Sequence, residues 1–135
     1  MQESTAVIRV VAALIVDESG RMQLVRKRGT TMFMQPGGKR EPGETWAAAL
    51  VRELHEELGM VANAANFEAL GSFESTAAYE AGYALVAEMF RVPALGEVQP
   101  LAEIDELAWL HPRDMASRPV APLVWDHALR FCTTR

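Results

Sequence analysis

The sequence predicts an α/β fold, also describable as α+β, in which a mixed β-sheet lies between helices. Three observations predict it. Short apolar segments with strand composition occur on both sides of an amphipathic helical pattern, a second helical pattern ends the chain, and each apolar helix stripe needs a sheet face to cover. The 135 residues suffice for one hydrophobic core, so we expect a single domain over residues 1–135.

Five segments have the composition of strands, because they are rich in apolar and β-branched residues and are bounded by turn residues. They are residues 6–16, 22–27, 67–74, 83–92 and 104–110. The first is apolar enough to be buried on both faces, and it ends in a predicted hairpin turn at residues 17–20. The third and fourth segments are expected to pair. Residues 32–35 form a short extended piece that leads into Pro36-Gly37-Gly38.

Two segments have the pattern of helices. The first helix is predicted to begin near Thr45, a good N-cap, and to end at Gly59, which suits a left-handed C-terminal position. Residues 122–131 predict a second amphipathic helix. The resulting order is strand, strand, helix, strand, strand, strand, helix.

Composition excludes several classes of function. The net charge of −5 argues against a nucleic-acid polymer as partner, and there is no apolar run long enough to span a membrane. The polar residues 1–5 are not followed by a signal-peptide pattern, so we expect a cytoplasmic protein, either monomer or homodimer. The single cysteine, Cys132, is best explained as a structural residue of the last helix.

The first helix carries three carboxylates on one stripe, because Glu53, Glu56 and Glu57 are spaced at i, i+3 and i+4. No lysine offsets this stripe, and like charges at such spacings destabilise a helix by about 0.2 to 0.5 kcal/mol per pair. A bound divalent cation would remove the repulsion. Oxygen ligands of this kind suit Mg²⁺, with Mn²⁺ as a substitute.

The segment from Gly38 to Met60 resembles the complete Nudix box. Gly38 is followed after five residues by Glu44, and after seven more by Arg52-Glu53-Leu54-His55-Glu56-Glu57-Leu58-Gly59-Met60. The resemblance implies an α/β/α sandwich and a MutT-like, Mg²⁺-dependent hydrolase that cleaves the pyrophosphate linkage of a nucleoside diphosphate joined to another group. The compact chain favours a nucleoside triphosphate or an oxidised nucleotide as substrate.

The resemblance also implies roles for individual residues. Glu56 and Glu57 correspond to metal ligands, Glu53 to a ligand or the general base, and Gly38 to a ligand through its main-chain carbonyl. Arg52 is expected to orient one of the carboxylates. Glu44, placed in the first turn of the helix, would support the loop or the metal.

Residues outside the box give weaker indications of a substrate site. Arg26 and Arg28 end the second strand and Lys39 follows the paired glycines, so all three are candidates to bind phosphate. Glu103 precedes Trp109 at a distance similar to that of a late catalytic glutamate in bacterial relatives, and Glu106 is an equal rival.

Two aromatic residues and one loop bear on base recognition. Phe33 and Tyr79 could stack on a base, although aromatic residues near strand ends are more often core residues. Residues 118–123 offer no carboxamide or carboxylate where family members specific for oxidised guanine read the purine edge. His55 alternates away from the acidic stripe and receives no catalytic role.

Other members of the family remain as alternatives. Dinucleoside polyphosphates, ADP-ribose and nucleotide sugars are possible substrates, although the proline typical of ADP-ribose enzymes is replaced by Ser75 and Thr76. A catalytically silent nucleotide sensor is disfavoured by the intact glutamates. A family isomerase is disfavoured because Cys132 lies too near the end of the chain.

Overall fold

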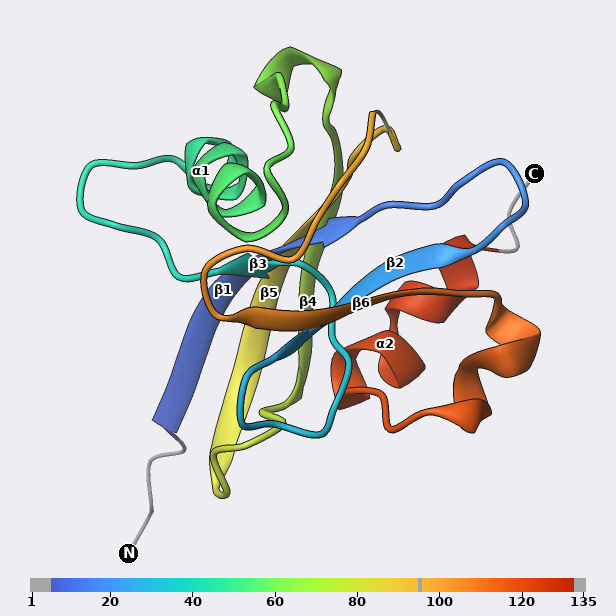
Figure 1. Cartoon of the computed structure of the whole chain (residues 1–135). Coiled ribbons are helices and arrows are strands. Elements are labelled where there is room, and N and C mark those ends of the chain that lie inside the picture. Colours follow the sequence, from blue (N-terminus) through green and yellow to red (C-terminus); the bar gives the residue numbers. More distant parts are fainter. Residues whose placement is uncertain (1–5, 95, 133–135) are drawn as a thin grey trace, which may run out of the picture.

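The computed structural model describes residues 6–94 and 96–132 (Figure 1). The strands are β1 (Ala6–Leu14), β2 (Met22–Lys27), β3 (Gly37–Gly38), β4 (Glu68–Thr76), β5 (Tyr83–Arg91) and β6 (Ile104–Leu110). The α-helices are α1 (Trp46–Leu58) and α2 (Pro122–Asp126), and 3₁₀ helices occupy Ala64–Asn66, Pro112–Ser117 and Ala128–Phe131.

The strands form a mixed sheet, as predicted. Its order is β3-β1-β5-β4, with β1 parallel to β5 and the other pairs antiparallel. The predicted pairing of the third and fourth strand segments is confirmed as the β4–β5 pair, which contains a register shift between Ala69 and Gly71. Strands β2 and β6 form a separate antiparallel ribbon.

Strand β1 divides the core into two layers. Val11, Ala13 and Ile15 belong to a cluster that includes the buried face of α1, whereas Ala12 and Leu14 belong to a second cluster with the C-terminal segment. In Figure 1, α1 and the C-terminal helices lie on opposite sides of the sheet. The predicted α/β/α sandwich is therefore confirmed.

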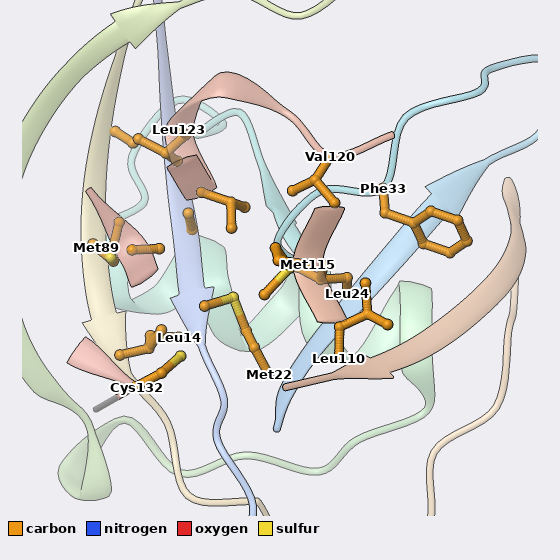
Figure 2. Close-up of a cluster of buried hydrophobic side chains, with 14 residues drawn as sticks. Leu14, Met22, Leu24, Phe33, Met89, Leu110, Met115, Val120, Leu123 and Cys132 are labelled. Atoms are coloured by element: carbon orange, nitrogen blue, oxygen red, sulfur yellow. The ribbon is translucent and has the colours of Figure 1, made fainter. Parts of the chain in front are cut away.

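The second cluster ties the β2–β6 ribbon to the sheet (Figure 2). Met22 and Leu24 of β2 lie beside Met115, and Cys132 lies beside Leu14. Burial raises the pKa of the Cys132 thiol to about 11. A thiol that keeps its proton at neutral pH is a poor nucleophile, which agrees with the prediction that Cys132 is a structural residue.

Helix α1 begins and ends as predicted. The Thr45 hydroxyl accepts a hydrogen bond from the Ala48 N–H at 3.0 Å, and Gly59 ends the helix with a φ of 69°. Leu50, Leu54 and Leu58 are fully buried against the sheet.

The prediction of one helix over residues 122–131 is wrong. Helix α2 ends at Asp126, His127 breaks it with φ −135° and ψ −49°, and a 3₁₀ helix follows. The His127 ring bonds the Glu74 carbonyl oxygen at 2.8 Å and packs on Phe73, with ring centroids 5.0 Å apart. These contacts with β4 compete with the regular helical path.

The first strand is shorter than predicted, and it is buried on both faces only from Val11 to Leu14. Val16 makes only an isolated bridge to Met22 across the turn. In the first half of β1, Ile8 and Val10 line a pocket, and the partly buried Val10 also packs against the core.

Candidate active site

The glycines of β3 allow close contact between the sheet and helix α1. A Cβ atom on Gly37, whose φ is 151°, would clash with the Val11 carbonyl oxygen. A Cβ atom on Gly38 would lie 2.6 Å from the carboxyl carbon of Glu53. The absence of side chains at both positions therefore lets the Glu53 carboxylate lie directly against the main chain of β3.

Glu57 is the most unusual carboxylate in the structure. Only 2% of the residue is exposed, its Oε1 accepts a long hydrogen bond of 3.3 Å from the Gly37 N–H, and its buried Oε2 has no hydrogen-bond partner among the described residues. Burial, followed by the neighbouring Glu53 carboxylate, raises the pKa of Glu57 far above its ordinary value of 4.5. The buried Glu57 carboxylate beside the partly buried Glu53 carboxylate calls for a proton or a cation between them.

Arg52 organises the rest of the acidic group. Its guanidinium donates two hydrogen bonds to Glu44, at 2.7 and 2.9 Å, and one to Glu53 at 3.0 Å. A further contact of 3.4 Å reaches Glu56, whose side chain is 52% exposed. The expectation that Arg52 orients a carboxylate fits this geometry.

Two details of the acidic stripe differ from expectation. No lysine offsets the stripe, but Arg52 partly compensates it, because it contacts both Glu53 and Glu56 where contact with one carboxylate was expected. Glu44 lies before the N-cap residue Thr45 and outside the first turn of α1. Two hydrogen bonds from Arg52, and a third from the Glu41 N–H, lower the pKa of Glu44 to about 2. Glu44 therefore holds the loop and Arg52 in place.

The chemistry of these donors fits a hard divalent cation. Within residues 6–94 and 96–132, no three acidic, histidine or cysteine side chains form a complete cation site, since Glu56 is turned to Arg52. The Oε2 atom of Glu57, which has no hydrogen-bond partner among the described residues, and the adjacent Glu53 carboxylate nevertheless provide oxygen ligands of the kind that Mg²⁺ binds. Rotation of the exposed Glu56 side chain would add a third carboxylate.

A pocket of about 440 Å³ opens beside these carboxylates. Strands β1 and β5 and the C-terminal segment supply apolar lining through Ile8, Val10, Leu85, Ala121, Leu123 and Val124. Charged residues also line it, namely Lys27, Lys39, Glu53, Glu80 and Glu103. An apolar compartment joined to a charged one has the character of a binding site for a nucleotide.

The predicted phosphate-binding residues divide into two groups. Lys39 lines the pocket, but Arg26 and Arg28 do not. Arg26 pairs with Asp105 and Glu106, each at 3.1 Å, and Arg28 donates to the Ala102 carbonyl oxygen at 3.1 Å. The structure thus gives both arginines partners on the β6 side of the molecule.

Lys27 was missed by sequence reasoning. It lies between the two arginines, lines the pocket, and its Nζ is 3.6 Å from Oε2 of Glu103. The strand register shifts between Arg26 and Lys27, so regular alternation along the strand could not place the Lys27 side chain. Of the two late glutamates, Glu103 lines the pocket, whereas Glu106 pairs with Arg26 and Arg118.

The two aromatic candidates also differ. Phe33 is a core residue, 3% exposed, while Tyr79 lines the pocket and is 47% exposed. Asp126 accepts a hydrogen bond from the Ser75 hydroxyl and does not line the pocket.

None of the helices in the described part of the chain is long and apolar enough to cross a membrane.

Comparison with known proteins agrees with this geometry. Residues 7–129 match the model of the NUDIX domain family. The chain is 31% identical over 119 residues to a CTP pyrophosphohydrolase of Escherichia coli, covering 85% of this chain and 84% of that protein. It is 43% identical over 60 residues to an 8-oxo-dGTP diphosphatase of Haemophilus influenzae, covering 42% and 44% of the two chains.

A solved structure shows the same architecture. The crystal structure of a MutT NUDIX hydrolase from Burkholderia pseudomallei superposes with a TM-score of 0.72 at 25% identity, covering 93% of this chain and 95% of that one. The family match spans nearly the whole chain, and Glu53 of its motif lines the pocket, with the buried Glu57 carboxylate beside it. This protein is a member of the Nudix family, a hydrolase that acts on nucleotide pyrophosphate bonds.

Proposed function

We propose that this protein is a Mg²⁺-dependent pyrophosphohydrolase of nucleoside triphosphates, including oxidised ones, with nucleoside monophosphate and pyrophosphate as products. The observation that carries the proposal is the Glu53–Glu57 carboxylate pair, which lies between α1 and β3 at the edge of the 440 Å³ pocket. The names of the E. coli and H. influenzae relatives support nucleoside triphosphates as the substrate class.

The cation would be held by Glu53, Glu56, Glu57 and the Gly38 carbonyl. When bound, Mg²⁺ supplies charge neutralisation on the phosphoryl oxygens and lowers the pKa of a bound water. Glu53 is the carboxylate of this group that lines the pocket, so it is placed to orient the attacking water or to accept its proton. Arg52 keeps Glu53 in position through its 3.0 Å hydrogen bond.

The chain's own cations would orient the phosphates. Lys27 and Lys39 both line the pocket, and ammonium groups bind phosphate oxygens as point charges. Glu103, 3.6 Å from Lys27, would hold this lysine until a phosphate group competes for it. The two lysines lie in a pocket that Glu53, Glu80 and Glu103 also line, and the chain carries a net charge of −5. Two positive side chains in such a setting fit a small phosphorylated ligand better than a nucleic-acid polymer.

The apolar part of the pocket would receive the base. Ala121, Leu123 and Val124 lie on this side, and no carboxamide or carboxylate stands among residues 118–123. This wall of the pocket would bind the base through contact area, and an apolar wall discriminates weakly between similar bases.

A substrate screen tests the proposal. Purified protein with Mg²⁺ is incubated with canonical and oxidised nucleoside triphosphates, nucleotide sugars, ADP-ribose and dinucleoside polyphosphates, and the products are separated by ion exchange. We expect a nucleoside triphosphate to give the highest kcat/KM and to release pyrophosphate. Highest activity on ADP-ribose or a dinucleoside polyphosphate would replace the proposed substrate class, and orthophosphate as first product would contradict the proposed bond.

A further inference from the structure

Two loops border the pocket opposite the acidic group. One joins β2 to β3 and contributes Thr30 and Met34; the other joins β4 to β5 and contributes residues 77–80. Tyr79 of the second loop reaches the first, where its hydroxyl oxygen accepts hydrogen bonds from the Thr31 N–H, at 2.8 Å, and from the Met32 N–H. The Tyr79 hydroxyl also lies 3.4 Å from the Thr31 hydroxyl, so one side chain joins the two loops at several points.

We propose that Tyr79 is a positioning residue for the nucleotide: its hydroxyl fixes the β2–β3 loop and hence the width of the pocket, and its ring forms a wall on which the base stacks. This inference rests on the proposed function, because it assigns the occupant of the same pocket. It adds a residue that lies far outside the Gly38–Met60 motif.

The hydroxyl suits the task because two consecutive main-chain N–H groups converge on one oxygen. A phenol oxygen has two acceptor lone pairs, so both are used by the same loop. Removing the oxygen leaves both N–H groups with no protein partner among the described residues. Thr31 and Met32 then lose their attachment to the β4–β5 loop, while Thr30 stays bonded to Lys27 and Arg26.

The ring itself is not held in the core, since 47% of Tyr79 is exposed although the residue lines the pocket. The turn that carries it is well defined. The Tyr83 N–H donates to the Glu80 carbonyl at 3.1 Å, the Ala77 N–H donates to the Tyr83 carbonyl at 3.2 Å, and Gly82 adopts a φ of 85°. A planar ring on a fixed turn, facing an apolar pocket, is suited to stacking on a base.

The loop is anchored again before it reaches the catalytic glycines. The Phe33 N–H donates to the Pro119 carbonyl and the Met34 N–H to the Val25 carbonyl, both at 2.8 Å. Loosening Thr31 and Met32 therefore changes the pocket wall without displacing Gly37 and Gly38. We expect the loss of the Tyr79 hydroxyl to raise KM and to leave kcat nearly unchanged.

The test compares Tyr79→Phe with Tyr83→Phe. Tyr83 is a matched control because it is 42% exposed in the neighbouring strand, does not line the pocket, and its side chain makes no hydrogen bond within the described part of the chain. Amide hydrogen exchange is followed at Thr31 and Met32. KM and kcat are measured with dGTP, and binding of its α,β-methylene analogue is measured by calorimetry.

For Tyr79→Phe we expect about tenfold faster exchange at both amides, about a fivefold rise in KM and in the Kd of the analogue, and kcat within about twofold of wild type. Tyr79→Ala is expected to raise both constants further, because it also removes the ring. Tyr83→Phe is expected to match wild type in every measurement.

Unchanged exchange and unchanged Kd in Tyr79→Phe would overturn the role of the hydroxyl, as would a fall in kcat at constant KM. Equal Kd values for Tyr79→Phe and Tyr79→Ala would overturn the stacking role. Amide exchange and analogue binding can be measured without turnover. If the wild-type protein binds the analogue but does not cleave dGTP, the result contradicts the proposed function and leaves the role of Tyr79 intact.

Discussion

The Arg52 guanidinium binds the Glu44 carboxylate through two parallel hydrogen bonds, from Nε to Oε2 at 2.7 Å and from Nη2 to Oε1 at 2.9 Å. The remaining nitrogen, Nη1, donates to Glu53 at 3.0 Å. Because Glu44 lies in the loop before α1 and Glu53 lies in the helix, one side chain fastens the loop to the carboxylate that borders the pocket.

This geometry predicts that Arg52→Lys lowers kcat by about tenfold or more with a smaller change in KM. A lysine ammonium cannot reproduce the planar fork that holds two carboxylates at once. Steady-state kinetics at saturating Mg²⁺ measure the effect. Arg28→Lys is the control, since Arg28 bonds a single carbonyl oxygen and does not line the pocket. A kcat equal to that of wild type in Arg52→Lys would refute the positioning role.

Stability without metal is expected to depend on pH through Glu57. Its pKa is raised in the folded protein, so the unfolded chain loses this proton first as pH rises. The stabilisation that the Glu57 proton gives to the folded state is complete below pH 4.5, the ordinary pKa of a glutamate. It is lost as pH rises toward the pKa of Glu57 in the folded protein. With EDTA present, the free energy of unfolding attributable to this site therefore decreases from mildly acidic to alkaline pH.

Denaturant unfolding of the EDTA-treated protein, followed by circular dichroism, measures this slope. Glu57→Gln supplies the matched variant, because the amide does not ionise and occupies the same space. We expect the free energy of unfolding of the wild-type protein to decrease relative to that of the variant as pH rises from about 5 to 8. Parallel curves for the two proteins would show that Glu57 titrates normally.

Metal removal is expected to abolish turnover and lower thermal stability. EDTA should eliminate activity, and Mg²⁺ or Mn²⁺ should restore it, because the site offers only oxygen ligands. The melting temperature should rise on metal addition in wild type, where the cation relieves repulsion between Glu53 and Glu57. The rise should be smaller in Glu57→Gln. Turnover that survives exhaustive chelation is incompatible with the proposed mechanism.

The relation between sequence and structure differs among parts of the molecule. Helix α1 was predicted at both ends because Thr45 and Gly59 are local signals that the structure uses as a cap and a terminator. The second helix was predicted too long because its break at His127 depends on contacts with Glu74 and Phe73, which are distant in sequence.

The site shows the same contrast. The Nudix motif identified the acidic residues, since their i, i+3 and i+4 spacing is a local property of a helix. Burial of Glu57 behind the Gly37 main chain could not be read from that spacing, because it depends on how α1 docks on β3. The position of Lys27 in the pocket could not be predicted from strand alternation either, because the register shifts between Arg26 and Lys27.

Base selectivity is expected to be weak. The pocket segment near residues 118–123 presents Ala121 but no carboxamide or carboxylate, and the nearby Asp126 is bonded to Ser75. Apolar pockets separate close analogues by only about 1 to 3 kcal/mol. We expect kcat/KM for 8-oxo-dGTP to exceed that for dGTP by less than about a hundredfold. A preference of several thousandfold would reveal another polar residue that reads the base.

The most direct test of the central claim is the kcat of Glu56→Gln and Glu57→Gln at saturating Mg²⁺. A glutamine amide is a poor Mg²⁺ ligand but fills the space of a glutamate, so folding should be retained, as circular dichroism can verify. We predict that each substitution lowers kcat by about 10²-fold or more. Near wild-type kcat in both variants would contradict the assignment of these carboxylates to the catalytic site.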